Sequence, residues 1–333
     1  MVSYPALLVI IYINKNKTTT RQMNKYLLLL TTILATGCIK ENRSNCNYDI
    51  SFSLSYVVDV EGNNLFDKSL DSITIHMFNE DDKYIYTKVE NTSTIINNGY
   101  IMTIPIEEPG TYKVVVIGDT DEGDYTIGSH TKSAAATKTL ISNETDLADF
   151  RISVKHDNGL IARELGDFFI ATPKEILVTG LASETVEVML TKNSKKIHLT
   201  INGQGDVSDL APTIRCKNGA YNAENTIPDN SEEITYKPHM SSATTRANSV
   251  FTTSMLRIVD GIPMPLSIGN ELGEKEVYDL VALIKLNPKY RTQEDLDAED
   301  EFNLTLNYSS DVFPTLISVT VNSWEHVFVT PEA

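Results

Sequence analysis

Tyr48-Asp-Ile-Ser-Phe-Ser-Leu-Ser-Tyr56 alternates bulky apolar side chains with small polar ones. The apolar residues, at positions 50, 52, 54 and 56, would lie on one face of an extended chain, and the serines between them on the other. A period of two residues is typical of a β-strand that buries one face and exposes the other to water. We therefore expect residues 48–60 to form a half-buried strand.

The same alternation continues along the chain, so strands are expected almost throughout. Further strands are predicted at residues 73–77, 84–86, 100–106, 112–117, 186–190, 197–201, 250–259, 277–286, 302–308 and 317–321. The four adjacent apolar residues at 114–117 predict a strand buried on both faces. Helical periodicity is weak except at residues 142–150. These patterns predict an all-β protein built from sandwich domains.

Polar segments separate the predicted strands. Asn79-Glu-Asp-Asp82 lies between two apolar runs and predicts a hairpin. Residues 291–301 are a polar and acidic spacer, and its acid-rich part at residues 294–301 is expected to be a solvated loop. The polar residues 191–194 lie between two strong strand patterns, so we expect one domain at residues 48–192 and a second at residues 193–333.

The strands are preceded by the parts of an export signal. Met23 and Lys25 are followed by an apolar run at residues 26–34 and then by Gly37-Cys38. This is the order found in a bacterial signal segment that is cleaved before a cysteine. We expect residues 1–37 to be removed and Cys38 to carry diacylglycerol and an N-acyl chain. Residues 38–47 would form a linker, and no other cofactor is expected.

A second apolar run, at residues 6–13, precedes Met23. Neither run reaches the roughly 18–20 apolar residues that a membrane-spanning helix needs. Met23 is therefore the expected start, and the alternative is a chain from Met1 whose two apolar runs anchor it. Ala35 stands three places before the cysteine, where lipoproteins prefer Leu, Val or Ile.

The chain is strongly acidic. Lys and Arg together number 28 against 45 Asp and Glu, a net charge of −17. Removal of residues 1–37 takes away four basic residues and no acidic one, which changes the net charge to −21. Such a chain is repelled by nucleic acid and by anionic lipid surfaces. Nucleic-acid binding is therefore not expected, and attachment to a membrane would depend on the acyl chains.

Few residues suggest chemistry. Cys46 and Cys216 would remain after lipidation, and they either form a disulfide or lie far apart. The six histidines are scattered, and the sequence contains no familiar catalytic or nucleotide-binding motif. The acidic residues 118–124 have calcium-type ligands without the calcium-loop spacing, so a solvated turn is favoured. Trp324 is expected to be buried beneath a sheet, and neither catalytic residues nor a metal site are expected.

Four segments resemble those of a known family. They are Cys38-Ile-Lys-Glu-Asn-Arg-Ser-Asn-Cys46, Ile73-Thr-Ile-His-Met-Phe78 with the acidic turn and Tyr84 that follow, Gly110-Thr-Tyr-Lys-Val-Val-Val-Ile-Gly118, and Ile317-Ser-Val-Thr-Val-Asn-Ser-Trp324. In this order they resemble the FimB-type fimbrial anchoring subunits of Bacteroidia, which are outer-membrane lipoproteins. The resemblance implies two tandem transthyretin-like β-sandwich domains, no enzymatic activity and pilin subunits as partners. Such a protein attaches or caps a fimbrium at the outer membrane and takes part in cell adhesion.

The resemblance also suggests which residues take part in assembly. Near the end of the chain we expect an assembly segment that contains Val319, Val321, Trp324, Val327 and Val329. In polymerising relatives, a protease is thought to cut after an arginine and to free the first strand for exchange with a neighbouring subunit.

Arginine is absent between Arg43 and Arg151. A cut at Arg43 would leave the first strand in place, and a cut at Arg151 would destroy the domain. The chain therefore resembles an uncleaved anchor, although a cut at Lys68 would still free the strand.

Two other features bear on location and function. Lys40-Glu41 resembles a signal for export to the cell surface, and a solvated spacer is the alternative. A surface glycan-binding lipoprotein of a polysaccharide uptake system is the alternative function, and a hydrolase is a third.

Overall fold

The structure of the chain is a computed structural model. It describes residues 48–56, 64–120, 122–130, 138–179, 184–203, 210–245, 247–269, 275–309 and 315–328. Contacts divide the chain into residues 1–46 and residues 47–333. The predicted signal segment, Cys38 and Cys46 therefore lie outside the described residues. Within the described ranges, no helix is both long enough and apolar enough to cross a bilayer.

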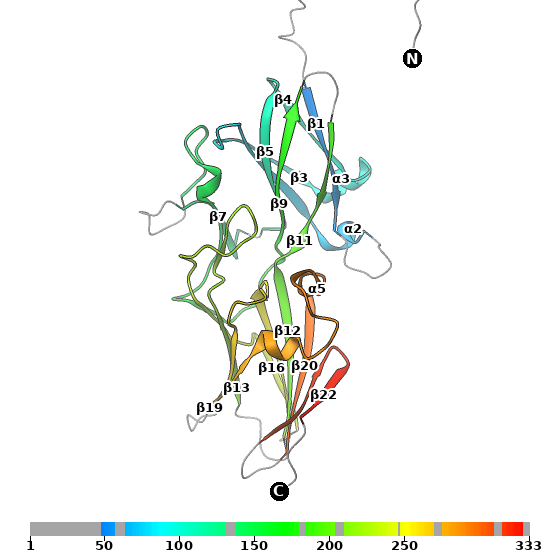
Figure 1. The fold of residues 1–333 in the computed structure, drawn as a ribbon, viewed down its shortest axis with the longest axis vertical. Coiled ribbons are helices and arrows are strands. Elements are labelled where there is room, and N and C mark those ends of the chain that lie inside the picture. The colour runs from blue at the N-terminus through cyan, green and yellow to red at the C-terminus, as the bar shows by residue number, and fades with distance from the viewer. Residues whose placement is uncertain are drawn as a thin grey trace, which may run out of the picture. The chain divides into compact units, whose positions relative to one another are not determined.

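Two sheets enclose the first core (Figure 1). The three-stranded sheet has the order β10 (Glu184–Met189), β1 (Tyr48–Ser55) and β4 (Ile101–Ile106). The five-stranded sheet has the order β11 (Thr191–Lys192), β9 (Phe169–Val178), β5 (Gly110–Gly118), β2 (Ser72–Phe78) and β3 (Tyr84–Asn91). Ile50, Phe52 and Leu54 of β1 are buried in this core, as their alternation with serines predicted. Two short helices, α2 (Phe66–Ser69) and α3 (Thr92–Asn97), add further apolar side chains.

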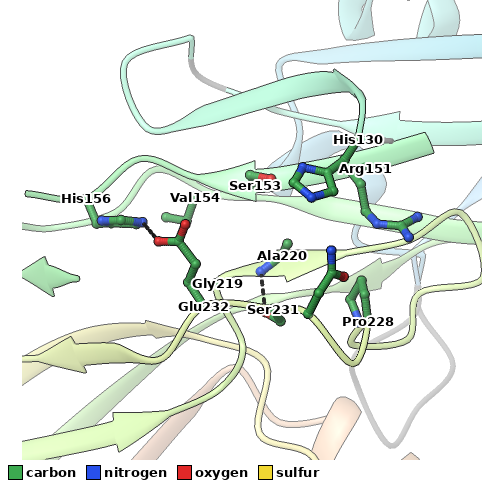
Figure 2. Close-up of a pocket in the computed structure, with 11 residues that line it drawn as sticks. His130, Arg151, Ser153, Val154, His156, Gly219, Ala220, Pro228, Ser231 and Glu232 are labelled. Carbon is green, nitrogen blue, oxygen red and sulfur yellow. Dashed lines mark hydrogen bonds and ion pairs between the residues drawn. The ribbon is translucent and has the colours of Figure 1, made fainter. Parts of the chain in front are cut away.

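The second core is larger and is formed by three further sheets together with the other face of the sheet that contains β5. A six-stranded sheet has the order β16 (Met240–Thr245), β17 (Asn248–Leu256), β12 (Ser194–Asn202), β20 (Glu301–Tyr308), β21 (Leu316–Val321) and β22 (Trp324–Val327). A five-stranded sheet has the order β19 (Lys275–Asp279), β18 (Pro265–Gly269), β13 (Ala211–Cys216), β15 (Ile234–Tyr236) and β8 (Leu160–Ile161). A three-stranded sheet has the order β14 (Ala220–Tyr221), β7 (Phe150–Val154) and β6 (Tyr125–Ser129). Beside this small sheet lies a hollow lined by β7 and by residues 219–232 (Figure 2).

Strand β5 contributes to both cores. Val114 and Val116 pack in the first core, whereas Val115 and Ile117 pack in the second. The prediction that this run is buried on both faces is confirmed. The reason is that one sheet separates the two cores, so each face of its strand meets apolar side chains.

The abundance of strands confirms the all-β prediction, and the transthyretin-like subtype stays a prediction. The domain boundary expected after residue 192 also stays a prediction. Strands from both sides of that residue share two sheets, since β7 pairs with β14 and β8 pairs with β15.

Local structure agrees with the sequence at one turn and differs from it in two segments. The hairpin at Asn79-Glu-Asp-Asp82 is confirmed, because it joins β2 to β3. The strand predicted at residues 277–286 is wrong after Asp279, whose carboxylate accepts the Val281 N–H and begins helix α4 (Leu280–Ile284). The helical pattern at residues 142–150 yields only the 3₁₀-helix η2 (Leu147–Asp149).

The solvated loop predicted at residues 294–301 is also wrong. It overlaps helix α5 (Gln293–Asp297), whose first turn is held by a capping box between Thr292 and Asp295. Leu296 is fully buried in the second core. A single apolar residue among acids gave too weak a periodicity to predict a helix.

Candidate functional site

Strand β1 is paired along both edges by strands of its own chain. It runs parallel to β10 from Ile50 to Ser55 and antiparallel to β4 from Tyr48 to Ser53. Without β1, the facing edges of β10 and β4 would present unpaired backbone groups, which is the kind of groove that a foreign strand fills. The chain's own β1 therefore fills the groove in which a strand of a neighbouring subunit would otherwise bind.

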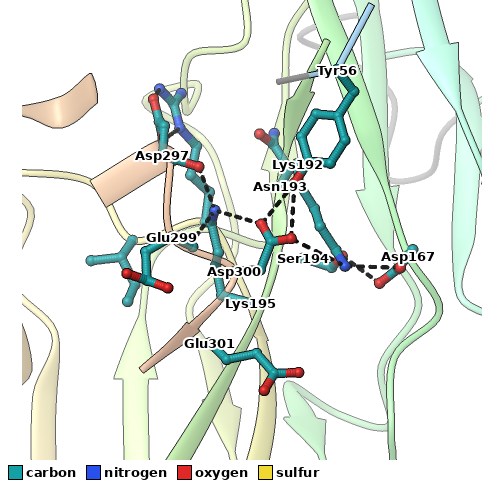
Figure 3. A network of polar contacts seen from close by, with 12 residues as sticks. Tyr56, Asp167, Lys192, Asn193, Ser194, Lys195, Asp297, Glu299, Asp300 and Glu301 are labelled. Carbon is teal, nitrogen blue, oxygen red and sulfur yellow. Dashed lines mark hydrogen bonds and ion pairs between the residues drawn. The ribbon is translucent and has the colours of Figure 1, made fainter. Parts of the chain in front are cut away.

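Tyr56, just after β1, ties this strand to the second core. Its hydroxyl donates to the carboxylate of Asp300 and lies 2.8 Å from each carboxylate oxygen (Figure 3). Its ring packs edge-on against Phe169, with the ring centroids 4.9 Å apart. Burial, followed by the charge of Asp300, raises the pKa of Tyr56, so the hydroxyl keeps its proton and remains a donor.

Lys195 is the buried cation of the same network. Its side chain is only 1% exposed, and Nζ donates to the carbonyl oxygens of Asp297 (2.8 Å) and Glu299 (2.6 Å). Nζ also lies 3.6 Å from Oδ1 of Asp300 (Figure 3). Burial lowers the pKa of Lys195 from 10.5 to about 8, and the nearby carboxylates only partly oppose this effect.

Further ion pairs fix the two ends of the network. Nζ of Lys192, in β11, lies 2.8 Å from the carboxylate of Asp167. Arg257 bonds both carboxylate oxygens of Asp297 at the end of α5, with Nε 2.6 Å from Oδ1. We call the group formed by Tyr56, Asp167, Lys192, Lys195, Arg257, Asp297 and Asp300 the junction network. It links the end of β1 to α5 and β12, two elements of the second core.

The predicted assembly segment forms the C-terminal hairpin. Val319 and Val321 of β21 are fully buried, whereas Trp324 and Val327 of β22 are 49% and 61% exposed. The expectation that Trp324 is buried beneath a sheet is therefore wrong, because it lies on the outermost strand of the six-stranded sheet. Val329 lies outside the described residues.

The contacts of Cys216 and of the acidic turn at residues 118–124 indicate structural roles. Cys216 is buried as a free thiol, and burial raises its pKa to about 12. Its predicted partner Cys46 lies outside the described residues, so the disulfide stays a prediction. Asp119 accepts the backbone N–H groups of residues 71 and 72, and Asp124 pairs with Arg163. No group of potential metal ligands gathers among the described residues.

Comparison with protein families identifies the chain. The profile of the Mfa2 family, described as fimbrillin-A associated anchor proteins Mfa1 and Mfa2, matches residues 43–330. The chain belongs to this family. The resemblance to fimbrial anchoring subunits of Bacteroidia is thereby confirmed, and the protein is a fimbrial subunit with a role in adhesion at the cell surface.

Solved structures of Bacteroidia proteins share the fold. A proposed polysaccharide-binding protein of Bacteroides thetaiotaomicron is 17% identical with a TM-score of 0.74, over 85% of this chain and 98% of that one. A proposed adhesin of Bacteroides ovatus is 18% identical with a TM-score of 0.73, over 86% and 96%. The fimbrial anchor protein Mfa2 of Porphyromonas gingivalis is 15% identical with a TM-score of 0.66, over 85% and 100%. No curated protein matched the sequence.

Sequence reasoning missed the junction network. Lys195 shares the strand period of Ile197, so alternation alone places it on the buried face. A lysine at an inward position of a strong strand is the signal that predicts a buried ion-pair partner. Its partner Asp300 could not be found in the same way, because it belongs to a segment that was predicted to be a solvated loop.

Proposed function

We propose that this protein is anchored to the outer membrane through acyl chains on Cys38 and holds the end of a fimbrium there. The observation that carries the proposal is the position of β1. It follows the predicted lipid linker within a few residues, and the chain's own β10 and β4 pair both of its edges. A subunit that keeps this strand stays connected to the lipid and does not offer its own groove to a neighbour.

The junction network supports retention of the strand. Release of β1 would expose its apolar face and would also break the contact between Tyr56 and Asp300. The absence of arginine between Arg43 and Arg151 supports the same conclusion. Arg151 itself lies within β7 and donates to two backbone carbonyls, so its strand is part of a folded sheet.

The C-terminal hairpin is the proposed contact with the next fimbrial subunit. β22 is an outer strand with only β21 beside it in the described part of the chain. Trp324 and Val327 add exposed apolar surface there. An outer strand with apolar side chains favours pairing with a strand of another protein.

Mass spectrometry of the protein isolated together with fimbriae tests the anchoring proposal. The expected result is an acylated Cys38 at the amino terminus of a chain that still includes residues 48–56. A new terminus after Arg43 or Lys68 in the fimbria-bound protein would contradict the proposal. Cys38→Ala should move the protein into soluble fractions, whereas the matched variant Cys46→Ala should stay with the membrane.

Capture of fimbrial subunits by the intact protein tests the hairpin contact. Val327→Lys places a charge on the proposed contact and should reduce the captured subunit at least tenfold. Val89→Lys, on the outer strand β3, is a matched control because Val89 is equally exposed. Equal capture by both variants would remove the hairpin from the interface.

We also propose that the protein is not an enzyme. Its family is one of fimbrial anchors, and the junction charges are paired with one another or with backbone carbonyls. Glycan presentation is the alternative. It would usually rely on exposed aromatic platforms, whereas the exposed Trp324 lies on β22, the strand that we assign to the contact with the next subunit.

A further inference from the structure

The hollow beside β7 contains a cation, Arg151, that forms no ion pair with any described residue, although the charges of Asp149 and Glu224 act on it from farther away. It has a volume of about 150 Å³. Residues that border it include His130, Arg151, Val154, His156, Pro228 and Glu232 (Figure 2). Arg163, Arg215 and Arg257 each face a carboxylate, whereas Arg151 forms no ion pair within the described residues. In a chain of net charge −17, a guanidinium that borders a hollow and forms no ion pair with the described residues is a candidate site for an anion.

Arg151 is held in position by its own backbone surroundings. Nη1 donates to the carbonyl oxygens of Ala148 (2.9 Å) and Phe150 (2.7 Å). Nε is buried and has no hydrogen-bond partner in the described part of the chain. A buried donor without an acceptor is costly, so an acceptor supplied by a ligand would stabilise this site. The edge formed by Nε and Nη2 is the one that fits the two oxygens of a carboxylate.

Of the other ionisable groups that border the hollow, His156 and Glu232 pair with each other, and His130 is the one that can contact a ligand. Nε2 of His156 lies 2.8 Å from Glu232, and Nδ1 of His156 accepts the N–H of Gly159. Glu232 is therefore already engaged by His156. The ring of His130 borders the hollow on the same side as Arg151 (Figure 2) and can add a donor to a bound anion.

The backbone around the hollow excludes a peptide strand as the ligand. The N–H of Ala220 donates to the hydroxyl of Ser231, and the N–H of Gly219 donates to the carbonyl of Glu232. These two backbone N–H groups, one in β14 and one just before it, already have acceptors. A peptide strand therefore cannot form backbone hydrogen bonds with them. The remaining recognition is by side chains, and the volume suits a group of about one sugar ring.

We propose that this hollow binds a carboxylate-bearing sugar residue, such as a uronic acid at the end of a glycan. The carboxylate lies against Arg151 and His130, and Val154 and Pro228 provide the apolar wall for the carbon–hydrogen face of the ring. This site is independent of the fimbrial contact proposed at β22. It would let a fimbrial subunit contact an acidic surface sugar although the protein as a whole is negatively charged.

Titration of the purified full-length protein with glucuronate, followed by calorimetry, tests the proposal. We expect binding of glucuronate, at least tenfold weaker binding of glucose, and at least tenfold weaker glucuronate binding by Arg151→Gln. Arg215→Gln is the matched control, because Arg215 forms an exposed pair with Glu233, and it should bind as the native protein does.

Arg151→Gln also removes two bonds to the backbone, so its folding must be checked by thermal unfolding. If it does not fold, Asn230→Asp decides the question, because it adds a negative charge at an exposed residue of the same hollow and should weaken glucuronate binding. Absence of glucuronate binding, equal binding of glucose, or unchanged binding by the folded variants would overturn the proposal. Binding of an acetylated dipeptide carboxylate in place of glucuronate would also overturn it.

Discussion

Lys195→Met should remove a contribution to stability that Lys195 makes in mild alkali and that grows with pH. Burial lowers the pKa of Lys195 from 10.5 to about 8. The unfolded chain therefore keeps the proton up to about pH 10.5, whereas the folded protein releases it near pH 8. Between these values unfolding takes up a proton at Lys195, so the contribution of this residue to the free energy of unfolding increases with pH.

The size of this effect follows from the two pKa values. Between about pH 7 and about pH 9.5, Lys195 alone should add about 2 kcal/mol to the free energy of unfolding. Below about pH 7 its contribution should be constant, because both states are then protonated. Methionine is a suitable replacement because it is unbranched, of similar length and uncharged.

Other groups titrate in the opposite direction. Burial raises the pKa of Cys216 to about 12 and also raises those of buried tyrosines such as Tyr221, so these groups destabilise the folded protein as pH rises. They are present in both proteins, and the difference between native protein and Lys195→Met therefore isolates the lysine. Asp300→Asn removes a charge that raises the pKa of Lys195, so the rise should begin at a lower pH.

Urea unfolding followed by circular dichroism at several pH values provides the measurement. The native free energy of unfolding, minus that of Lys195→Met, should grow by about 2 kcal/mol from about pH 7 to about pH 9.5. A difference that stays constant over this range would refute the assignment of Lys195 as a buried, titrating cation. The junction network would then need a different electrostatic description.

Three other predictions concern Tyr56, Gly118 and His76. Tyr56→Phe keeps the ring but removes the donor to its aspartate partner, and should lower the free energy of unfolding by about 1–3 kcal/mol in urea. Gly118→Ala places a methyl group against the side chain of Leu70 and should cost about 1–3 kcal/mol, whereas Gly110→Ala has 3.8 Å to the nearest atom and should lower the melting temperature less. His76 is buried, and burial lowers its pKa from 6.5 to about 4, so stability should fall by up to about 3 kcal/mol as pH decreases from about 6.5 to about 4. A His76→Leu protein that keeps the same acid dependence would contradict the last prediction.

Strand periodicity predicted most of the sheets because it reports which face of each strand is buried. Ile50, Phe52 and Leu54 show this directly, since each is buried where the alternation places it. The run at residues 114–117 carried more information, because apolar residues on both faces of a strand require apolar side chains packed against both faces. The sequence could not show that the two faces pack in different cores.

Acidic segments were interpreted less well than apolar ones. The charges at residues 294–301 suggested solvation, yet Asp297 and Asp300 face Arg257 and Lys195 in the interior. A charged residue is compatible with both water and a buried partner, and the partner lies far away in sequence. Trp324 shows the converse, because an apolar side chain on an outer strand remains exposed when no further element covers it.

Residue type and spacing along the chain were enough to predict the strand content and the lipid signal, and they include the absence of arginine between Arg43 and Arg151. These properties are local, since each depends on residue type and spacing along the chain. The pairings in space are of another kind: β1 lies between β10 and β4, Tyr56 reaches Asp300, and Arg151 borders a hollow whose one lining acid, Glu232, pairs with His156. Such facts depend on pairings between residues up to 244 positions apart, which no local pattern encodes.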